Sequence, residues 1–212
     1  QSGGWNWMFH ALAILDGKTE TRSSGFYDLA DVLKDTPNLL VSLEDVFAEI
    51  RSKTLVWHNW SADHRNVLFG EWHIANIYRA DTIARGRRQK PRPKMSSHKE
   101  MAKWIKSVRA LPEEFPVSKA VFDKVPAVNF VGLSRLGPKS YLQTHTHNNP
   151  DALVCHVGVD IPEGDVGIEV DGEDRSWFHA RQVIVFDDCL PHMAWNRSNQ
   201  PRTVLHIDIE NK

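Results

Sequence analysis

Cysteine is scarce in this sequence, neither sign of charge is in excess, and long apolar runs are missing. The two cysteines, Cys155 and Cys189, are too few for a disulfide framework, so we expect a reducing compartment and a cytoplasmic protein. The 26 Lys and Arg residues balance 27 Asp and Glu residues, which argues against nucleic acid or anionic membranes as general partners. No apolar run reaches the roughly 20 residues of a transmembrane helix, so no membrane span is expected.

The first half of the chain does contain hydrophobic residues at helical spacing. Three apolar stripes predict three helices that pack on a core: Phe26, Leu29, Ala30 and Leu33; Leu43, Val46, Phe47 and Ile50; and Met101, Trp104, Ile105 and Val108. Capping patterns predict that the second helix starts at Ser42, with Asp45, and the third at Ser97, with Glu100. Residues 71–78, between these two helices, are expected to form a strand.

From Pro126 onward the pattern changes to short apolar runs separated by turn residues. Seven strands are predicted: Ala127–Ser134, Leu142–His145, Leu153–Ile161, Gly167–Val170, Arg181–Phe186, His192–Asn196 and Thr203–Ile209. Strands of this length and spacing predict an antiparallel jelly roll, and thus a mainly β, α+β fold that is buttressed by the N-terminal helices. We expect a single domain over residues 1–212, with residues 1–125 as helical support and residues 126–212 as the jelly-roll core.

The candidate functional residues lie in this β-rich half. His145 and His147 are separated by one residue at the end of a strand, where an extended backbone points both side chains to the same face. His192 begins a later strand, which a Greek-key topology can bring beside the first. Imidazoles with an oxygen ligand are typical of non-haem Fe(II), but zinc accepts similar ligands. Taken alone, the histidines favour a structural role.

Arg202 changes this balance. It begins a strongly apolar strand, and an arginine that points into a β-barrel needs an anion because a buried unpaired charge is costly. The planar guanidinium is well shaped for a carboxylate. Two histidines and such an arginine together indicate a metal site that also holds a carboxylate co-substrate. The alternative is an exposed arginine near the turn at Gln200-Pro201.

Several motifs in the β-rich half match one known family in order and spacing. They are HT at His145-Thr146, HVGVDIP at residues 156–162, Trp177, VIVFDDCLPHMAWN at residues 183–196, and R-x-x-L-x-I-D at residues 202–208. Through these motifs, residues 134–208 resemble the catalytic domain of the aspartyl/asparaginyl β-hydroxylase family. The resemblance implies a double-stranded β-helix, which is a jelly-roll form, with Fe(II) as cofactor and 2-oxoglutarate and O2 as co-substrates.

The resemblance also implies a role for individual residues. His145 and His192 match the two imidazoles that bind iron. Arg202 matches the residue that pairs with the distal carboxylate of 2-oxoglutarate, and Ser134 falls where the family places a hydroxyl on that carboxylate. His156 matches a histidine that contacts the metal-side carboxylate of the co-substrate. One further residue, Asp188, matches an aspartate near the iron-bound water.

Two positions depart from the family pattern. Val154 stands where many relatives have an arginine that anchors the co-substrate, and His206 is a candidate replacement because it shares strand parity with Arg202. His147 follows the first iron-binding histidine at a position that is often not a ligand in this family. It is either a third imidazole ligand or a residue that faces the pocket mouth or bonds to the turn at Asn148-Asn149.

Contacts to substrate are less defined by the sequence. Trp195 is a candidate for the pocket wall. Residues 85–94 carry six basic residues, among them Arg87 and Arg88. Such a segment is either a solvated loop or a loop that meets an acidic substrate or an acidic carrier protein.

The expected activity is that of a 2-oxoglutarate- and Fe(II)-dependent dioxygenase, with succinate and CO2 as co-products. It would hydroxylate an unactivated carbon, the β-carbon of an Asp- or Asn-like amino acid that is free, carrier-bound or part of a peptide. Two other functions stay open. One is a cupin-like metal dioxygenase or isomerase without 2-oxoglutarate, and the other is a non-catalytic jelly roll that binds a carboxylate.

Overall fold

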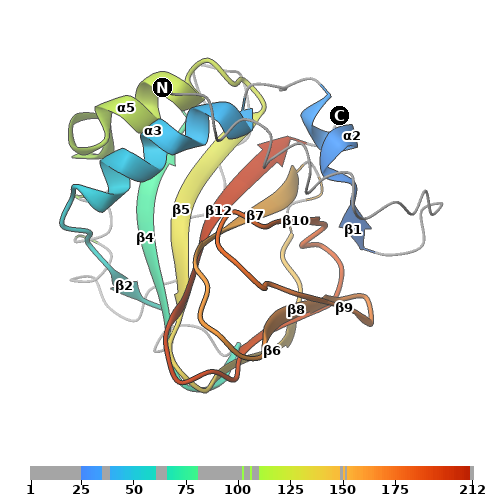
Figure 1. The fold of residues 1–212 in the computed structure, drawn as a ribbon. Helices are drawn as coiled ribbons and strands as arrows, with labels where there is room; N and C mark the ends of the chain where they lie inside the picture. Colours follow the sequence, from blue (N-terminus) through green and yellow to red (C-terminus); the bar gives the residue numbers. More distant parts are fainter. Residues whose placement is uncertain are drawn as a thin grey trace, which may run out of the picture.

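The computed structural model describes residues 25–34, 39–60, 66–80, 102, 106, 110–148, 150 and 152–210, and in this part of the chain two antiparallel sheets form the body of the fold (Figure 1). The larger sheet has the strand order β1 (Phe26–Tyr27), β10 (Val183–Phe186), β7 (Ala152–Asp160), β12 (Arg202–Glu210), β5 (Val128–Leu136), β4 (Trp72–Arg79) and β2 (His58–Asn59). The smaller sheet has the order β3 (Val67–Phe69), β6 (Ser140–His145), β11 (His192–Asn196), β8 (Val166–Val170) and β9 (Glu173–Ser176). The predicted mainly β jelly roll is confirmed.

Alternation along β12 separates two apolar layers on either side of the larger sheet. Leu205, Ile207 and Ile209 are buried in one hydrophobic cluster with residues of helices α3 (Leu39–Arg51) and α5 (Pro116–Phe122). The alternate residue Val204 belongs to a second cluster with Val166 and other residues of the smaller sheet. The helices therefore cover the outer face of the larger sheet, and the smaller sheet covers its inner face (Figure 1).

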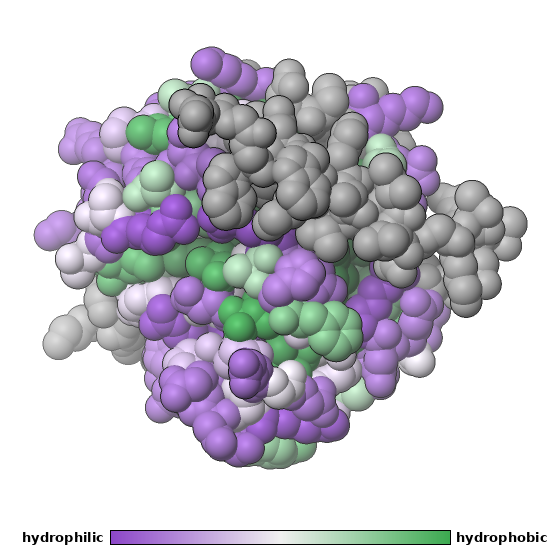
Figure 2. Space-filling view, viewed as in Figure 1, coloured by the Kyte–Doolittle hydropathy of each residue, from purple (hydrophilic) through white to green (hydrophobic). Residues whose placement is uncertain are grey.

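Hydrophobic residues also reach the surface. On the face seen in Figure 2, they gather in a band across the middle of the molecule, with hydrophilic residues around it. No helix of the described residues is long and apolar enough to cross a membrane.

The strands predicted after Pro126 are present, with ends that differ by a few residues, and β4 confirms the strand predicted over residues 71–78. Two predictions for the first half were wrong. Phe26 lies in strand β1, opposite Phe186, and helix α2 (Leu29–Leu33) begins only after Asp28, whose side chain accepts a hydrogen bond from the Ala30 amide. The second helix begins at Leu39 rather than at Ser42, because Leu39 is itself buried in the core and extends the apolar stripe by a turn.

Other predicted features fall outside the described residues. These include the start and the apolar stripe of the third helix and the basic segment at residues 85–94. Helix α5 was not predicted, because its capping group comes from far away in the sequence. The carboxylate of Glu49 on α3 accepts hydrogen bonds from the amides of Val117 and Ser118, at 2.8 Å each.

Asn196, the last residue of β11, connects the turns at one end of the two sheets. Its Nδ2 lies 2.8–3.1 Å from the carbonyl oxygens of Leu136, Gly137 and Gln200. Its Oδ1 accepts hydrogen bonds from the amide and the hydroxyl of Ser198. Because the side chain is fully buried, these groups have no water to replace it. Asn196 thus fixes the turn from which β12 begins.

We therefore predict that Asn196→Ala lowers the free energy of unfolding by about 3 kcal/mol, since several buried polar groups lose their partner at once. Asn196→Asp, which has the same shape but lacks the amide donors, should cost a similar amount. Urea unfolding of purified variants measures both changes. The exposed Asn199 of the same turn provides the control, and Asn199→Ala should change stability by less than about 0.5 kcal/mol. Equal stability of the Asn196 and Asn199 variants would contradict this role.

Candidate metal and carboxylate site

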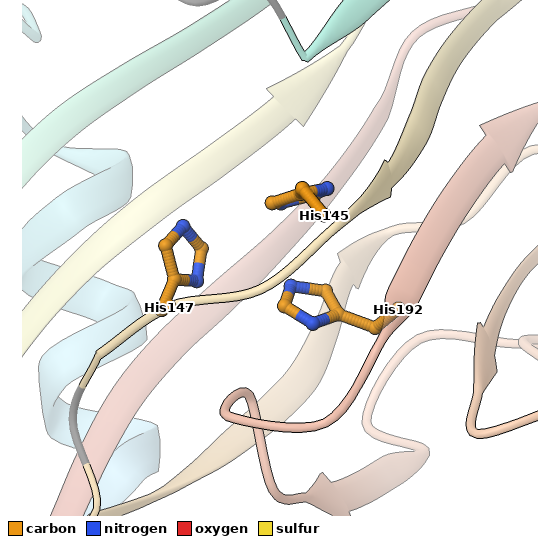
Figure 3. Close-up of side chains that lie close together, drawn as sticks. All are labelled: His145, His147 and His192. Carbon is orange, nitrogen blue, oxygen red and sulfur yellow. The ribbon is translucent and has the colours of Figure 1, made fainter.

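Three histidines meet at one end of the smaller sheet. His145 ends β6, His147 follows it by two residues, and His192 begins β11. The ring centres lie 4.3 Å apart for His145 and His192, 5.0 Å for His145 and His147, and 5.2 Å for His147 and His192. One nitrogen from each ring lies within 4.8 Å of the other two. The three rings surround a common space, as Figure 3 shows, where they could together hold a metal ion.

An irregularity in β6 brings His145 to this position. His192 is opposite His145, whereas Ala194, two residues later, is opposite Leu142, three residues earlier. One extra residue on β6 makes this a β-bulge, which changes the face to which the following side chains point. Leu142 can therefore pack in the interior beside Ala194 while His145 also faces inward beside His192.

Hydrogen bonds set the orientation of each ring. Nδ1 of His145 lies 2.8 Å from the carbonyl oxygen of Gln143, and Nδ1 of His192 lies 2.8 Å from that of Leu190. Because a carbonyl oxygen can only accept, each Nδ1 carries the hydrogen and each Nε2 carries the lone pair. This tautomer is the one that binds metal through Nε2. Burial is the main cause that lowers the pKa of His192, which keeps this ring neutral at pH 7.

Asp188 holds the third ring in the same manner. Its Oδ2 lies 3.1 Å from Nδ1 of His147, and its carbonyl oxygen accepts a hydrogen bond from the His147 amide at 2.8 Å. The carboxylate is buried, and its other oxygen, Oδ1, has no partner among the described residues. His147 thus contacts Asp188 through Nδ1, while Asn149 of the following turn lies outside the described residues. The predicted contact of Asp188 with a metal-bound water stays a prediction.

Arg202 lies buried on the inner face of the larger sheet. Only 2% of the residue is exposed, and among the described residues Nε and Nη1 have no hydrogen-bond partner. Its guanidinium carbon lies 5.0 Å from the ring centre of Trp177. Burial lowers the pKa of Arg202 to about 10, so the side chain keeps its positive charge at neutral pH. A buried charge in this state calls for an anion.

Ser134 and His156 occupy the same inner face. Ser134 on β5 pairs with Val204 on β12, and its hydroxyl accepts a hydrogen bond of 3.0 Å from Nε1 of Trp72. His156 on β7 lies opposite His206 on β12, and Nε2 of His156 is 3.0 Å from Nδ1 of His206. The structure therefore places Ser134, His156, Arg202 and His206 on one face of one sheet. Their roles toward a co-substrate stay predictions.

Trp195 is not brought to this site, and the basic segment at residues 85–94 lies outside the described residues. Trp195 lies on the face of β11 opposite to His192, where its Nε1 donates to Asp165. It packs over Gly167, since a Cβ atom at Gly167 would stand 2.4 Å from the indole. Arg87 and Arg88 lie outside the described residues.

Sequence reasoning missed Phe186, which lies between the two groups of polar residues. Its ring centre is 5.1 Å from that of His156 and 5.8 Å from that of His192. Strand alternation could have identified it, because Ile184 and Phe186 share one face of β10 and both lie in the inner cluster. Trp177, which the sequence indicated only as part of the family motifs, is next to both Arg202 and His156.

The donor set suits a divalent transition metal beside a carboxylate. Oriented imidazoles provide nitrogen ligands, as zinc and non-haem Fe(II) sites do. Nε and Nη1 of Arg202 are buried without a partner among the described residues, and both can donate to the oxygens of a carboxylate. Fold and site together define a jelly-roll protein with a candidate metal centre between its sheets.

Comparison with known proteins assigns this chain to a family. A model of the aspartyl/asparaginyl beta-hydroxylase family matches residues 52–212, so the chain belongs to that family of hydroxylases. An ornithine lipid ester-linked acyl 2-hydroxylase of Rhizobium tropici is 29% identical over 96 residues, which are 44% of this chain and 34% of that enzyme. The match thus spans about a third of the length of that relative.

Solved structures show a weaker likeness. An oxidoreductase of the 2OG-Fe(II) oxygenase family from Burkholderia pseudomallei is 14% identical, with a TM-score of 0.43 over 79% of this chain and 78% of that one. A predicted oxalate decarboxylase from Thermotoga maritima is 15% identical, with a TM-score of 0.41 over 74% of this chain and 94% of that one. At these values the two structures add nothing to the family assignment.

We predict that His147→Ala and Asp188→Asn each weaken Fe(II) binding by about tenfold or more, because in a three-histidine site one would remove a ligand and the other would remove the carboxylate that orients it. Anaerobic equilibrium titration measures the affinity. The exposed carboxylate of Asp174 provides the matched control, and Asp174→Asn should bind iron as the parent does. Unchanged affinity in His147→Ala would contradict a three-histidine site and leave His145 and His192 as the ligands.

Proposed function

We propose that this protein is an Fe(II)- and 2-oxoglutarate-dependent dioxygenase that hydroxylates an unactivated carbon. The observation that carries the proposal is the buried guanidinium of Arg202, whose Nε and Nη1 have no partner among the described residues. A hydrolytic or structural metal site has no need of a buried cation beside it, whereas a co-substrate with two carboxylates has. Membership of a hydroxylase family supports the same reaction class.

In this proposal, one sheet would bind the metal and the other would bind the co-substrate. His145 and His192, and His147 with the support of Asp188, would hold the metal from the smaller sheet. Arg202 would pair with the distal carboxylate of 2-oxoglutarate, and the Ser134 hydroxyl would donate a further hydrogen bond to it. Iron, 2-oxoglutarate and O2 would supply the oxidation, with succinate and CO2 as co-products. Phe186 and Trp177 would exclude water from the space between these groups.

We base the proposed substrate class on what the reactions of the family and of the Rhizobium tropici enzyme have in common, as their names describe them. The β-carbon of an aspartyl or asparaginyl residue is next to the side-chain carbonyl carbon, and position 2 of an acyl chain is next to the acyl carbonyl carbon. Both reactions hydroxylate a methylene group beside a carbonyl. We therefore propose such a methylene as the reacting group. It would belong to an Asp- or Asn-like amino acid that is free, carrier-bound or in a peptide, and an acyl chain is the second candidate.

One observation favours a different function. The third histidine and its buried aspartate partner would complete an all-imidazole metal site, which favours a cupin-like metal dioxygenase or isomerase that does not use 2-oxoglutarate. Such an enzyme leaves the buried charge of Arg202 without a function. Binding of 2-oxoglutarate separates the two proposals.

We predict that anaerobic addition of 2-oxoglutarate to the Fe(II)-loaded protein produces the visible charge-transfer band of a metal-chelated 2-oxo acid. His192→Ala should abolish the band. Arg202→Lys should raise the concentration of 2-oxoglutarate at half-saturation by about tenfold to a hundredfold, because an ammonium replaces a fork of donors, with Fe(II) affinity unchanged. Arg197 is exposed and bonds to Asp165, so Arg197→Lys is the matched control and should leave the titration unaltered. Iron binding without a band in the parent protein would favour the cupin-like alternative.

A further inference from the structure

Three titratable side chains form a line on the inner face of the larger sheet. Asp208 on β12 is fully buried, and its Oδ1 lies 2.8 Å from Nε2 of His206. Nδ1 of His206 lies 3.0 Å from Nε2 of His156 on the neighbouring strand β7. Nδ1 of His156 ends the line, and this atom is buried without a hydrogen-bond partner among the described residues. We call Asp208, His206 and His156 the proton chain.

The hydrogen positions in the proton chain depend on one another. An ionised carboxylate only accepts hydrogen bonds, so Nε2 of His206 carries a hydrogen. When His206 is neutral, its Nδ1 is an acceptor, and His156 must then donate from Nε2. His156 is left with a lone pair on its unpartnered Nδ1. In this state the proton chain presents a lone pair, which would repel a carboxylate oxygen, on the same inner face as the buried Arg202.

One added proton reverses the direction of the hydrogen bond between His206 and His156. If both nitrogens of His206 carry hydrogens, Nδ1 of His206 donates to Nε2 of His156, and the hydrogen of His156 stands on Nδ1. The hydrogen on Nε2 of His156 passes to His206 and a solvent proton joins Nδ1 of His156, so the proton chain gains one proton. The positive charge then lies on His206 beside the carboxylate of Asp208, and an N–H points away from the chain.

The charged groups around the proton chain favour His206 as the site of this charge. Burial, followed by His206, Arg202 and His192, lowers the pKa of His156 well below its ordinary value, so His156 stays neutral. Phe130 of β5 meets the ring of His206 edge-on, at 5.8 Å between centres, and carries no charge. Arg79 of β4 is electrostatically coupled to Asp208. Among the described residues, Arg79 and Arg202 are thus coupled to the proton chain, and a further anion would stabilise the added proton.

We propose that His206, held by Asp208, is a positioning residue that takes up one proton when a dicarboxylate binds at Arg202, so that His156 presents an N–H to the metal-side carboxylate of that molecule. The inference rests on the proposed function, because it takes 2-oxoglutarate as the dicarboxylate. It gives His206 an indirect role, in which it acts through His156 instead of contacting the co-substrate itself.

Calorimetric titration tests the proposal through the proton count. 2-Oxoglutarate is added to the anaerobic Fe(II)-loaded protein at one pH in two buffers whose protonation enthalpies differ, such as phosphate and Tris. The parent protein should take up about one proton per 2-oxoglutarate, and its affinity should rise up to about tenfold for each unit that the pH falls. His206→Gln should take up none and bind with an affinity independent of pH, because the amide can bond to both neighbours but cannot accept a proton.

His179→Gln is the matched control, since His179 is exposed and bonds only to the carbonyl oxygen of Ala180 among the described residues. It should reproduce the proton uptake of the parent. Binding of 2-oxoglutarate by the parent without proton uptake would overturn the inference and leave the proposed function intact. Parental proton uptake in His206→Gln would also overturn it. If the parent binds Fe(II) but not 2-oxoglutarate, the proposed function fails and the inference fails with it. Should His206→Gln not fold, the two-buffer measurement on the parent protein decides.

Discussion

A positive charge buried between two sheets is the constraint on which the other features of this fold depend. Arg202 begins β12, which lies between β7 and β5 in the middle of the larger sheet, and the turn held by Asn196 fixes where that strand starts. The guanidinium is shielded from solvent, and it lies on the face of the sheet opposite to the helices. An isolated buried charge costs several kcal/mol, so the interior must provide an anion or admit one. Under the proposed function, the larger sheet would present groups for a carboxylate and the smaller sheet would present groups for a metal.

Backbone features, and not only the choice of side chains, determine how the two halves of the site are arranged. The bulge in β6 allows Leu142 to pack and His145 to face His192 at the same time. Carbonyl oxygens of Gln143 and Leu190 fix the tautomers, which requires no further polar side chain. Phe186 lies between the rings of His156 and His192, so the carboxylate side and the metal side are separated by one aromatic ring. A ligand that reaches from Arg202 to the histidines would span this gap.

Most strands of the jelly roll could be predicted because each is short, apolar and bounded by turn residues, which are local signals. The helix start at Leu39 and the whole of α5 could not, since one depends on burial in the core and the other on a carboxylate, Glu49, from a distant segment. The candidate site shows the same division. Residue types and the family resemblance identified the histidines and Arg202. The bond between His147 and Asp188 and the pairing of His156 with His206 depend on strand register, which sequence spacing does not reveal.

We infer that one interior would hold both a metal and a carboxylate, on opposite sheets. An anaerobic crystal structure of the protein with Fe(II) and 2-oxoglutarate, with anomalous data at the iron edge, tests it most directly. We predict an iron peak between the Nε2 atoms of His145 and His192, and a carboxylate of 2-oxoglutarate on the guanidinium of Arg202. Iron bound elsewhere, or 2-oxoglutarate bound away from a guanidinium that still lacks an anion, would contradict the account.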